Sequence, residues 1–377
     1  MTVVFLLSIG ILLHGFVLYP LSLLLLRWLL GDRSAHAMAP ITPSLTLVIA
    51  AHNEETVIAG KLENSLRLDY PDGRLRIVVV SDASNDGTNR IVASYADRGV
   101  ELFVVEERLG KVACLNRLLP HVATDLVVMS DANSLYEPDS LRRLTRHFDA
   151  EQVGCVCGEL RYVNPRLLAA GEGERVYWGY ERGIKRLESS LGTLLGANGA
   201  IYAYRSHLFR AVNPLMFCDD VIPIQIALLG YKTLYEPAAR CTEEAVDERV
   251  EFRRRRRHAS FGLRSMLWAI GAAARRGRLL LVYECLSHRV FRWMGGLSIC
   301  ALLLSSFYLP PPLRSFALAT QGVFYAAACV GLVGSYFRLK TGPCYLAYYY
   351  LAISLAGILG LAAFALRTDK PYWDPRC

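Results

Sequence analysis

The sequence predicts an α/β domain with a mostly parallel sheet, flanked by hydrophobic helices at both ends of the chain. Short apolar runs alternate with helical patterns between residues 44 and 130, which is typical of βαβ units. In addition, 53% of the 377 residues are hydrophobic, and the longest apolar stretches lie near the two termini. A chain of this length has room for one large domain and several membrane segments.

The first element is an apolar stretch over residues 3–26, which only His14 and Pro20 interrupt. It is long enough to cross a bilayer as a helix. It lacks the basic start and the small-residue cleavage site of a signal peptide. We therefore expect a retained membrane anchor within residues 1–34.

Strands and helices alternate in the polar middle of the chain. The expected strands are residues 45–50, 75–80, 102–105 and 126–129, and the expected helices are residues 54–68, 88–96 and 112–119. Parallel sheets of this kind bind ligands beyond the carboxyl ends of their strands. Polar side chains follow three of these ends, at residues 52–54, 81–82 and 131–133.

The C-terminal part has three more apolar stretches, at about residues 293–309, 315–337 and 345–366. The first is short enough for a re-entrant segment. A buried core helix would explain one such stretch but hardly four in the chain. We expect about three C-terminal membrane helices within residues 291–377.

Basic residues set the expected orientation, because those beside membrane spans are usually cytoplasmic. They are Arg27, Arg33, Arg275, Arg276, Arg278, Arg289 and Arg292. This places the polar middle in the cytoplasm and the chain, as a multi-pass protein, in the inner (cytoplasmic) membrane of the cell. Residues 259–290 mix large apolar side chains with arginines, which is typical of helices lying in a membrane interface.

The net charge of +8 is concentrated near the membrane segments and in residues 253–257. Membrane lipids with anionic headgroups, or diphosphates, are therefore expected partners, and nucleic acid is not. The ten cysteines include no CxxC pair, and Cys155 and Cys157 suit one face of a strand. Reduced thiols in a cytoplasmic setting explain them.

Asp131 and Asn133 follow the apolar run at residues 126–129 and offer two oxygen ligands at a strand end. Mg²⁺ or Mn²⁺ is commonly held by one or two protein oxygens together with the phosphates of a substrate. The alternative is an Asx-turn that ends the strand before the helix start at residues 138–140. No GxGxxG follows the first strand, and Gly110-Lys111 lacks the upstream glycine of a P-loop.

Six short motifs occur in an order that resembles the membrane-bound glycosyltransferase family 2, which includes cellulose, hyaluronan and chito-oligosaccharide synthases. They are residues 49–55 (IAAHNEE), 79–88 (VVSDASNDGT), 110–116 (GKVACLN), 130–133 (SDAN), 196–203 (GANGAIYA) and 218–220 (CDD). The resemblance covers about residues 44–260. It implies a GT-A-like, Rossmann-like catalytic domain over residues 35–258. It also implies inverting transfer from a nucleotide sugar, usually a UDP-sugar, with Mg²⁺ or Mn²⁺.

The resemblance assigns the catalytic base to Asp220, the last acid of the pair with Asp219. Two adjacent acids repel each other, which can raise the pKa of one of them. The alternative for this pair is an N-cap of the helix that runs to residue 229. Gly196, Asn198 and Asp219 are assigned to the acceptor side, where glycine lets the backbone approach a sugar.

The resemblance also implies a donor site. Asp131 faces the phosphates and ribose, and Asn133 helps to hold the metal. Many relatives have Asp at position 133, so metal affinity is expected to be weaker here. Asp82 resembles the contact to the nucleotide base, with Ser81 in place of the usual preceding acid.

His52, Glu54 and Lys111 complete the expected donor site. His52 stands where relatives often have Tyr and would stack on the base or pack the loop. Lys111 takes the place of a lysine near the donor, with a surface lysine at a helix start as the alternative. Asp86 is expected to be a turn residue.

The arginine run at residues 253–257 stands in the place of the family's Gln-x-x-Arg-Trp motif, with Arg254 at Gln, Arg257 at Arg and His258 at Trp. Arg257 would clamp the donor diphosphate, while the other arginines form a solvated or lipid-facing basic patch. The missing Trp weakens the case for a processive polymerase.

We therefore expect a membrane glycosyltransferase that acts on a lipid-linked or growing glycan acceptor. Its close rival is a processive polysaccharide synthase that also translocates its product. A transporter would need ionisable or broken elements inside the apolar stretches, which are nearly free of them. An anchored nucleotidyltransferase would release diphosphate instead of a nucleoside diphosphate.

Overall fold

The computed structural model describes residues 1–34, 39–163, 167–244, 248–337, 339, 341–368 and 370. Contacts within the chain divide it into two compact units. We call the first the helical unit; it comprises Met1–Leu29, Asn164–Leu187 and Ala245–Asp369. The second, the sheet unit, comprises Leu30–Val163, Glu188–Glu244 and Lys370–Cys377. Residues 164–187 thus group with the helices, although they lie within the predicted catalytic segment 35–258, whose boundaries stay a prediction.

The sheet unit is built on one eight-stranded sheet with the order β3-β2-β1-β4-β7-β6-β8-β5. The strands are β1 (Leu45–Ala51), β2 (Leu75–Asp82), β3 (Val100–Val105), β4 (Leu126–Asp131), β5 (Leu135–Tyr136), β6 (Val153–Tyr162), β7 (Tyr202–Arg205) and β8 (Lys232–Glu243). The first four strands in this order pair in parallel. Strand β7 is antiparallel to β4 and β6, β5 is antiparallel to β8, and β6 and β8 are parallel. The parallel half is the predicted half, and the whole sheet is mixed.

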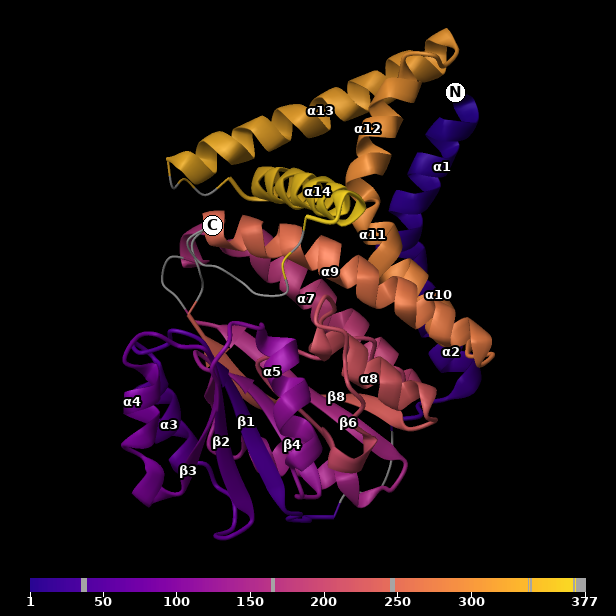
Figure 1. Ribbon diagram of the computed structural model, residues 1–377. Helices are drawn as coiled ribbons and strands as arrows, with labels where there is room; N and C mark the ends of the chain where they lie inside the picture. The colour runs from indigo at the N-terminus through magenta and orange to yellow at the C-terminus, as the bar shows by residue number, and fades with distance from the viewer. Residues whose placement is uncertain are drawn as a thin grey trace. The chain divides into compact units, whose positions relative to one another are not determined.

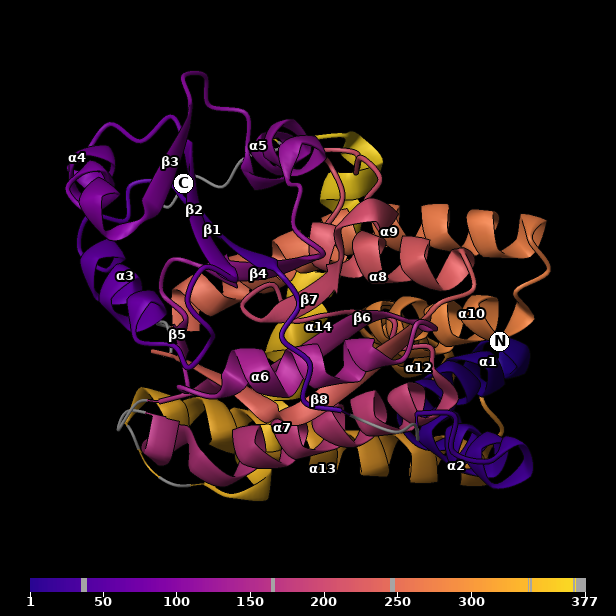
Figure 2. The ribbon, with the colours of Figure 1, turned by 90° about the horizontal axis from the view of Figure 1, so that it is seen from below.

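Helices cover both faces of this sheet (Figure 2). Helices α3 (Ile58–Leu66) and α6 (Ser140–Thr145) lie on one face, and α5 (Lys111–Leu118) and α8 (Cys218–Leu228) lie on the other. Helix α4 (Thr88–Ala93) contacts β3. Leu62 of α3 and Leu144 of α6 are fully buried in the main core with strand residues such as Ile49. Each such side chain contributes about 1.5–3 kcal/mol of hydrophobic stabilisation.

Two predicted elements differ in detail. The helix expected at residues 54–68 starts only at Ile58, because the preceding residues form a loop bonded to the loop after β2. Cys155 and Cys157 lie on β6 as predicted, and both are buried opposite Tyr204 and Tyr202 of β7.

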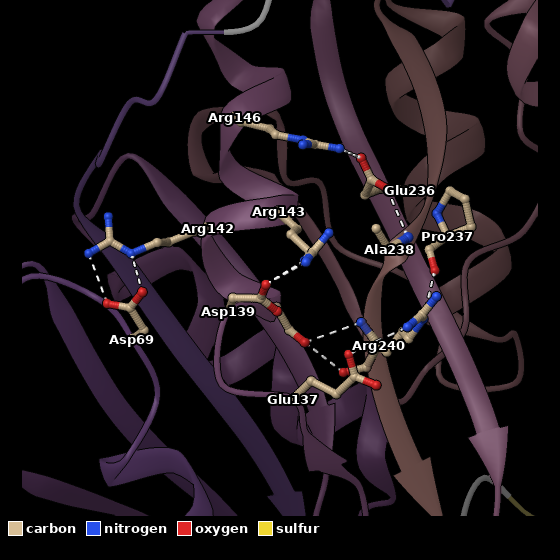
Figure 3. A network of polar contacts seen from close by, with 11 residues as sticks. Asp69, Glu137, Asp139, Arg142, Arg143, Arg146, Glu236, Pro237, Ala238 and Arg240 are labelled. Atoms are coloured by element: carbon tan, nitrogen blue, oxygen red, sulfur yellow. Dashed lines mark hydrogen bonds and ion pairs between the residues drawn. The ribbon is translucent and has the colours of Figure 1, made fainter.

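A polar network joins α6 to β8 (Figure 3). Glu236 of β8 accepts hydrogen bonds from Arg146 and, at 2.7 Å, from His147 Nε2. Burial opposes ionisation of Glu236, but these hydrogen bonds prevail and lower its pKa to about 2. In the same view, Arg142 forms a two-bond pair with Asp69. The network joins Glu236 of β8 to Arg146 and His147, which follow α6 in the chain.

The helical unit contains both apolar helices and helices with many charged residues. They are α1 (Thr2–Leu13), η1 (His14–Leu18), α2 (Tyr19–Leu30), α7 (Leu167–Leu191), α9 (Glu248–Arg275), α10 (Leu279–Glu284), η6 (Cys285–Val290), α11 (Phe291–Trp293), α12 (Gly295–Ser306), α13 (Pro311–Tyr336) and α14 (Pro343–Leu366). Helix α14 packs against both α9 and α13, and α1 packs against α12 (Figure 1). The predicted interfacial stretch corresponds to the end of α9, α10 and η6.

Three helices in the described part of the chain are long and apolar enough to cross a membrane: Thr2–Leu30, Pro311–Tyr336 and Pro343–Leu366. The N-terminal span and two of the C-terminal spans are thus present. The first C-terminal stretch forms the shorter helix α12, with 12 residues. The polar contacts of this unit include an ion pair between Arg292 and Glu181, and the Arg292 guanidinium carbon lies 5.3 Å from the centre of the Phe16 ring.

Candidate active site

The loops after β1 and β2 interlock at the carboxyl edge of the sheet. His52 Nδ1 lies 2.6 Å from the carbonyl oxygen of Asp82. Asn53 has φ 54°, a left-handed conformation that Asn tolerates better than most residues, and exchanges two hydrogen bonds with Asn85. Asp86 accepts from the backbone N–H of Thr88 and of Glu55, which confirms it as a turn residue. His52 therefore packs the loop; its predicted base contact stays a prediction.

Asp82 is 4% exposed and anchors the turn before α5. Its Oδ1 accepts from the N–H of Leu109 at 2.8 Å, and its Oδ2 accepts from the N–H of Gly110 at 2.9 Å and from Arg108 Nη1 at 2.8 Å. Sequence reasoning missed Arg108, although it stands two residues before the glycine-lysine motif.

Three charged side chains converge at Gly199. A Cβ atom at this position would lie 3.4 Å from Asp219 Oδ2, 3.6 Å from Lys111 Nζ and 3.7 Å from Asp131 Oδ2. Lys111 also forms an ion pair with Asp131 Oδ1. The segment at residues 196–203 therefore lies, at Gly199, beside the end of β4, the start of α5 and the start of α8. Sequence reasoning did not single out Gly199.

Lys111 begins α5, as the alternative of a lysine at a helix start has it, but it is half-buried and paired with Asp131. Burial disfavours its charge, but the carboxylates of Asp131 and Asp219 outweigh burial and raise the pKa of Lys111 above its usual value. The ammonium stays charged beside the two acids.

Asp131 and Asn133 fit a cation shared with a substrate. The Asp131 side chain is 30% exposed at the end of β4, and Asn133 is exposed two residues later. Among the described residues, no group of three His, Cys, Asp or Glu side chains is arranged to hold a metal. Two protein oxygens with open positions suit Mg²⁺ or Mn²⁺ only when donor phosphates complete the shell.

Glu54 is a half-buried carboxyl in the same region. Burial, together with the carboxylates of Asp131 and Asp86, raises the pKa of Glu54 to about 7. Its backbone N–H donates to Thr88 Oγ1 at 2.8 Å. A carboxyl with this pKa exchanges its proton near neutral pH, which is a common property of functional sites.

Asp219 and Asp220 lie in the first turn of α8, which begins at Cys218 with Phe217 as its N-cap. The alternative that these acids cap the helix is therefore wrong. Asp219 is half-buried and faces the Gly199 cluster, while Asp220 is 7% exposed. The positive end of the helix dipole favours anions at both positions.

The segment at residues 196–203 is fixed by backbone and side-chain hydrogen bonds. The N–H of Ala197 donates to the carbonyl oxygen of Asp219 at 2.8 Å, and Asn198 Nδ2 donates to the carbonyl oxygen of Gly158 at 3.0 Å. Gly196 is buried in the same segment. Asn198 thus positions the backbone; its predicted contact with the acceptor, like that of Gly196, stays a prediction.

Asn116 of the GKVACLN motif holds the loop that leads into α8. Its Nδ2 donates to the carbonyl oxygen of Val212 at 2.6 Å, and its Oδ1 accepts from the N–H of Val212 at 3.0 Å. One helix, α5, therefore carries Lys111 at its start and positions the acids of α8 from its middle.

Arg257 belongs to the helical unit, on α9. Its guanidinium carbon lies 4.8 Å from the centre of the Phe261 ring, one turn later. The structure describes Arg257 within that unit, and its predicted contact with the donor diphosphate stays a prediction. The residues that the sheet unit brings together are Glu54, Asp82, Lys111, Asp131 and Asp219.

Solved structures with the same fold define the class. A mannosyltransferase of Pyrobaculum calidifontis, solved with GDP-Man and Mn²⁺, is 22% identical, with a TM-score of 0.73 over 97% of this chain and 100% of the other. TarS of S. aureus, solved with UDP-GlcNAc, is 15% identical, with a TM-score of 0.50 over 86% of this chain and 92% of the other. These likenesses establish a GT-A glycosyltransferase fold.

Residues 46–211 match the model of "Glycosyl transferase family 2", and the chain carries a domain of this family. A beta-monoglucosyldiacylglycerol synthase of Trichormus variabilis is 32% identical over 118 residues, which are 30% of this chain and 25% of that protein. A poly-beta-1,6-N-acetyl-D-glucosamine synthase of Staphylococcus aureus is 25% identical over 203 residues, which are 52% and 49% of the two chains. The aligned regions span half or less of these relatives.

Proposed function

We propose that the chain is an inverting, metal-dependent glycosyltransferase of the inner membrane. It moves a sugar from a UDP-sugar to a lipid-linked or growing glycan acceptor at the cytoplasmic face. The observation that carries this proposal is the convergence of Lys111, Asp131 and Asp219 on Gly199. The Lys111 ammonium suits the phosphates of a sugar donor, and a carboxylate nearby can accept a proton. Gly199 has no side chain, which leaves room for the donor between these groups.

In the proposed reaction, an acceptor hydroxyl gives its proton to the Asp220 carboxylate. The hydroxyl oxygen then forms a bond to the anomeric carbon from the side opposite the diphosphate. The bond from that carbon to the phosphate oxygen breaks, and its electron pair leaves with the nucleoside diphosphate. A single displacement of this kind inverts the anomeric configuration.

The other residues bind and orient. Lys111 supplies a fixed positive charge toward the donor phosphates, and Asp82 meets the base. Asp131 and Asn133 would hold Mg²⁺ or Mn²⁺, which supplies positive charge against the leaving diphosphate when bound. The structures of similar fold were solved with Mn²⁺ and GDP-Man or with UDP-GlcNAc, so a divalent metal and a nucleotide sugar are supported, and the UDP-sugar is the proposed choice.

A lipid-linked acceptor is favoured by the three membrane-length helices and by the glucosyldiacylglycerol synthase relatives. The second candidate is a processive polysaccharide synthase, which the poly-N-acetylglucosamine synthase relatives favour. Product length separates the two. Long polymer made by the purified protein from one nucleotide sugar would refute single addition.

The donor is tested with a panel of UDP- and GDP-sugars, Mg²⁺ or Mn²⁺ and a native lipid extract. We expect release of nucleoside diphosphate from one UDP-sugar. Release from GDP-mannose alone would overturn the UDP assignment. Release of inorganic diphosphate from a nucleoside triphosphate would instead identify a nucleotidyltransferase.

The base is tested with Asp220→Asn. We expect transfer to fall by about a hundredfold or more, because general-base catalysis contributes on that order. Donor binding, measured by calorimetry, should stay within about twofold. Asp97→Asn serves as the control, because Asp97 is exposed and lies outside the six motifs; it should keep full activity. Near-normal transfer by Asp220→Asn would disprove the assignment.

A further inference from the structure

The turn after Asp131 is held from one side by two polar residues of α3. Lys61 is 0% exposed, and its Nζ donates to the carbonyl oxygen of Ser134 at 2.6 Å. Asn64 takes both backbone groups of Tyr136: its Nδ2 donates to the carbonyl oxygen at 2.9 Å, and its Oδ1 accepts from the N–H at 2.8 Å. The backbone that carries the proposed metal ligands is therefore fixed by side chains of another element.

The same turn is held from the other side by β8. Glu243, which is 4% exposed, accepts a hydrogen bond from the Ser134 hydroxyl. Strand β5 pairs with β8 through Leu135 and Thr242. Strand β8 is joined to α6 by the two hydrogen bonds between Ser140 and Arg240, three residues before Glu243.

Lys61 and Glu243 therefore form a buried charge pair that Ser134 bridges. The carbonyl oxygen of Ser134 accepts from the ammonium, and its hydroxyl donates to the carboxylate. The ammonium also lies 4.2 Å from the centre of the Tyr136 ring. The Tyr136 hydroxyl in turn donates to the carbonyl oxygens of Met129 and Ala200 at 2.9 and 3.1 Å. These contacts tie the turn to β4 and to the segment beside Gly199.

A charged residue at position 61 has a cost that packing alone does not explain. Burial lowers the pKa of Lys61 to about 7, although negative groups nearby, Asp131 and Glu243 among them, oppose this shift. Methionine would fill a similar volume against Tyr136 without desolvating a charge. The contact that methionine cannot make is the hydrogen bond from Nζ to the carbonyl oxygen of Ser134, in the turn after Asp131.

We propose that Lys61 is a positioning residue that fixes the Asp131–Asn133 turn for metal binding through the Ser134 carbonyl, with Glu243 as its buried counter-charge. This inference rests on the proposed function, since it assigns the metal to that turn. Residues that orient metal ligands typically change metal affinity by ten- to a hundredfold when they are removed. Lys61 touches neither substrate nor metal, so its effect falls on affinity and not on the chemical step.

The test uses the full chain in detergent. Mn²⁺ binding in the presence of UDP is measured by electron paramagnetic resonance for the wild type, Lys61→Met and Lys232→Met. Lys232→Met is the matched control, at a half-exposed lysine at the opposite end of β8. We expect the Mn²⁺ Kd to rise about tenfold or more in Lys61→Met only. Saturating Mn²⁺ should restore kcat to within about threefold.

If Lys61→Met does not fold, the double variant Lys61→Met/Glu243→Gln removes both charges and relieves the uncompensated Glu243. It should fold and still bind Mn²⁺ weakly. Wild-type affinity in either folded variant would overturn the proposal, as would a lower kcat at saturating Mn²⁺ with unchanged Kd. A wild-type chain that does not bind Mn²⁺ overturns it too. A wild-type chain that binds Mn²⁺ without sugar transfer refutes the proposed function, and the Kd comparison still decides the role of Lys61.

Discussion

At position 133 the chain has an amide where the resemblance leads us to expect a carboxylate in many relatives. The amide oxygen of Asn133 is exposed, at the end of a turn that begins with Asp131. We expect Asn133→Asp to tighten Mn²⁺ binding several-fold, because a charged oxygen is a stronger ligand for a hard cation. Titration of Mn²⁺ in the presence of UDP measures this. Asn85→Asp, in another loop, is the control, and unchanged or weaker affinity in Asn133→Asp would count against the metal assignment.

Glu54 makes a prediction about pH. Its pKa is raised from 4.5 to about 7 in the folded chain, so the folded state holds this proton more tightly than the unfolded state does. The resulting stabilisation is complete below about pH 4.5 and is lost as pH rises through 7. Without metal, the melting temperature of Glu54→Gln should therefore be close to that of the wild type at pH 4.5 and higher than that of the wild type at pH 8.

Melting of the metal-free protein in detergent at several pH values tests this difference. Glu107→Gln, at an exposed acid, provides the comparison. Parallel melting curves of wild type and Glu54→Gln across this pH range would show that Glu54 does not titrate in this way.

The sequence identified residue types but not their partners. Asp131, Lys111 and Asp219 were predicted as site residues from motifs, and the sheet unit brings them together. Arg108 and Lys61 were missed because their partners are distant in the sequence. Arg108 contacts Asp82, 26 residues away, and Lys61 contacts Ser134, 73 residues away. Such pairings depend on the register of the whole sheet, which no local pattern contains.

At the scale of elements, helix α5 contributes both to the proposed donor site and to the loop before the proposed base, Asp220. It presents Lys111 at its start and holds Val212 through Asn116. We expect Asn116→Ala to lower kcat at least tenfold, because the loop before Asp219 and Asp220 loses two hydrogen bonds. The free energy of unfolding should fall by about 1–3 kcal/mol.

Asn116→Asp keeps an acceptor for the Val212 N–H and loses the donor, so its kcat should lie between wild type and Asn116→Ala. Steady-state kinetics and chemical unfolding measure the two quantities separately. Equal loss of stability in both variants with full activity in Asn116→Ala would show that the clamp serves folding alone.

Local periodicity predicted the parallel strands well, since β1, β2 and β4 each contain a run of at least four apolar residues. It failed where tertiary contacts decide the outcome. The predicted helix begins at Ile58 and not at residue 54, and the backbone N–H groups of Glu54 and Glu55 bond to Thr88 and Asp86. The antiparallel strand β7 has four residues, too few for a clear pattern.

At the scale of the whole molecule, three helices within the described residues have the length and composition of membrane spans. The proposed cytoplasmic orientation makes a prediction about sealed vesicles. Inside-out vesicles should release nucleoside diphosphate from an added nucleotide sugar, because the donor reaches the sheet unit directly. Right-side-out vesicles should do so only after detergent is added. Activity in intact right-side-out vesicles would reverse the orientation.

The ion pair between Lys111 and Asp131 also bears on how the purified protein can be handled. A carboxylate site stripped of its cation usually leaves negative charges that repel one another. Here an internal ammonium stands beside the acids, so chelators such as EDTA should stop turnover without lowering the melting temperature by more than a degree or two. Storage in chelator and reloading with metal then become practical; a large drop in melting temperature would contradict this.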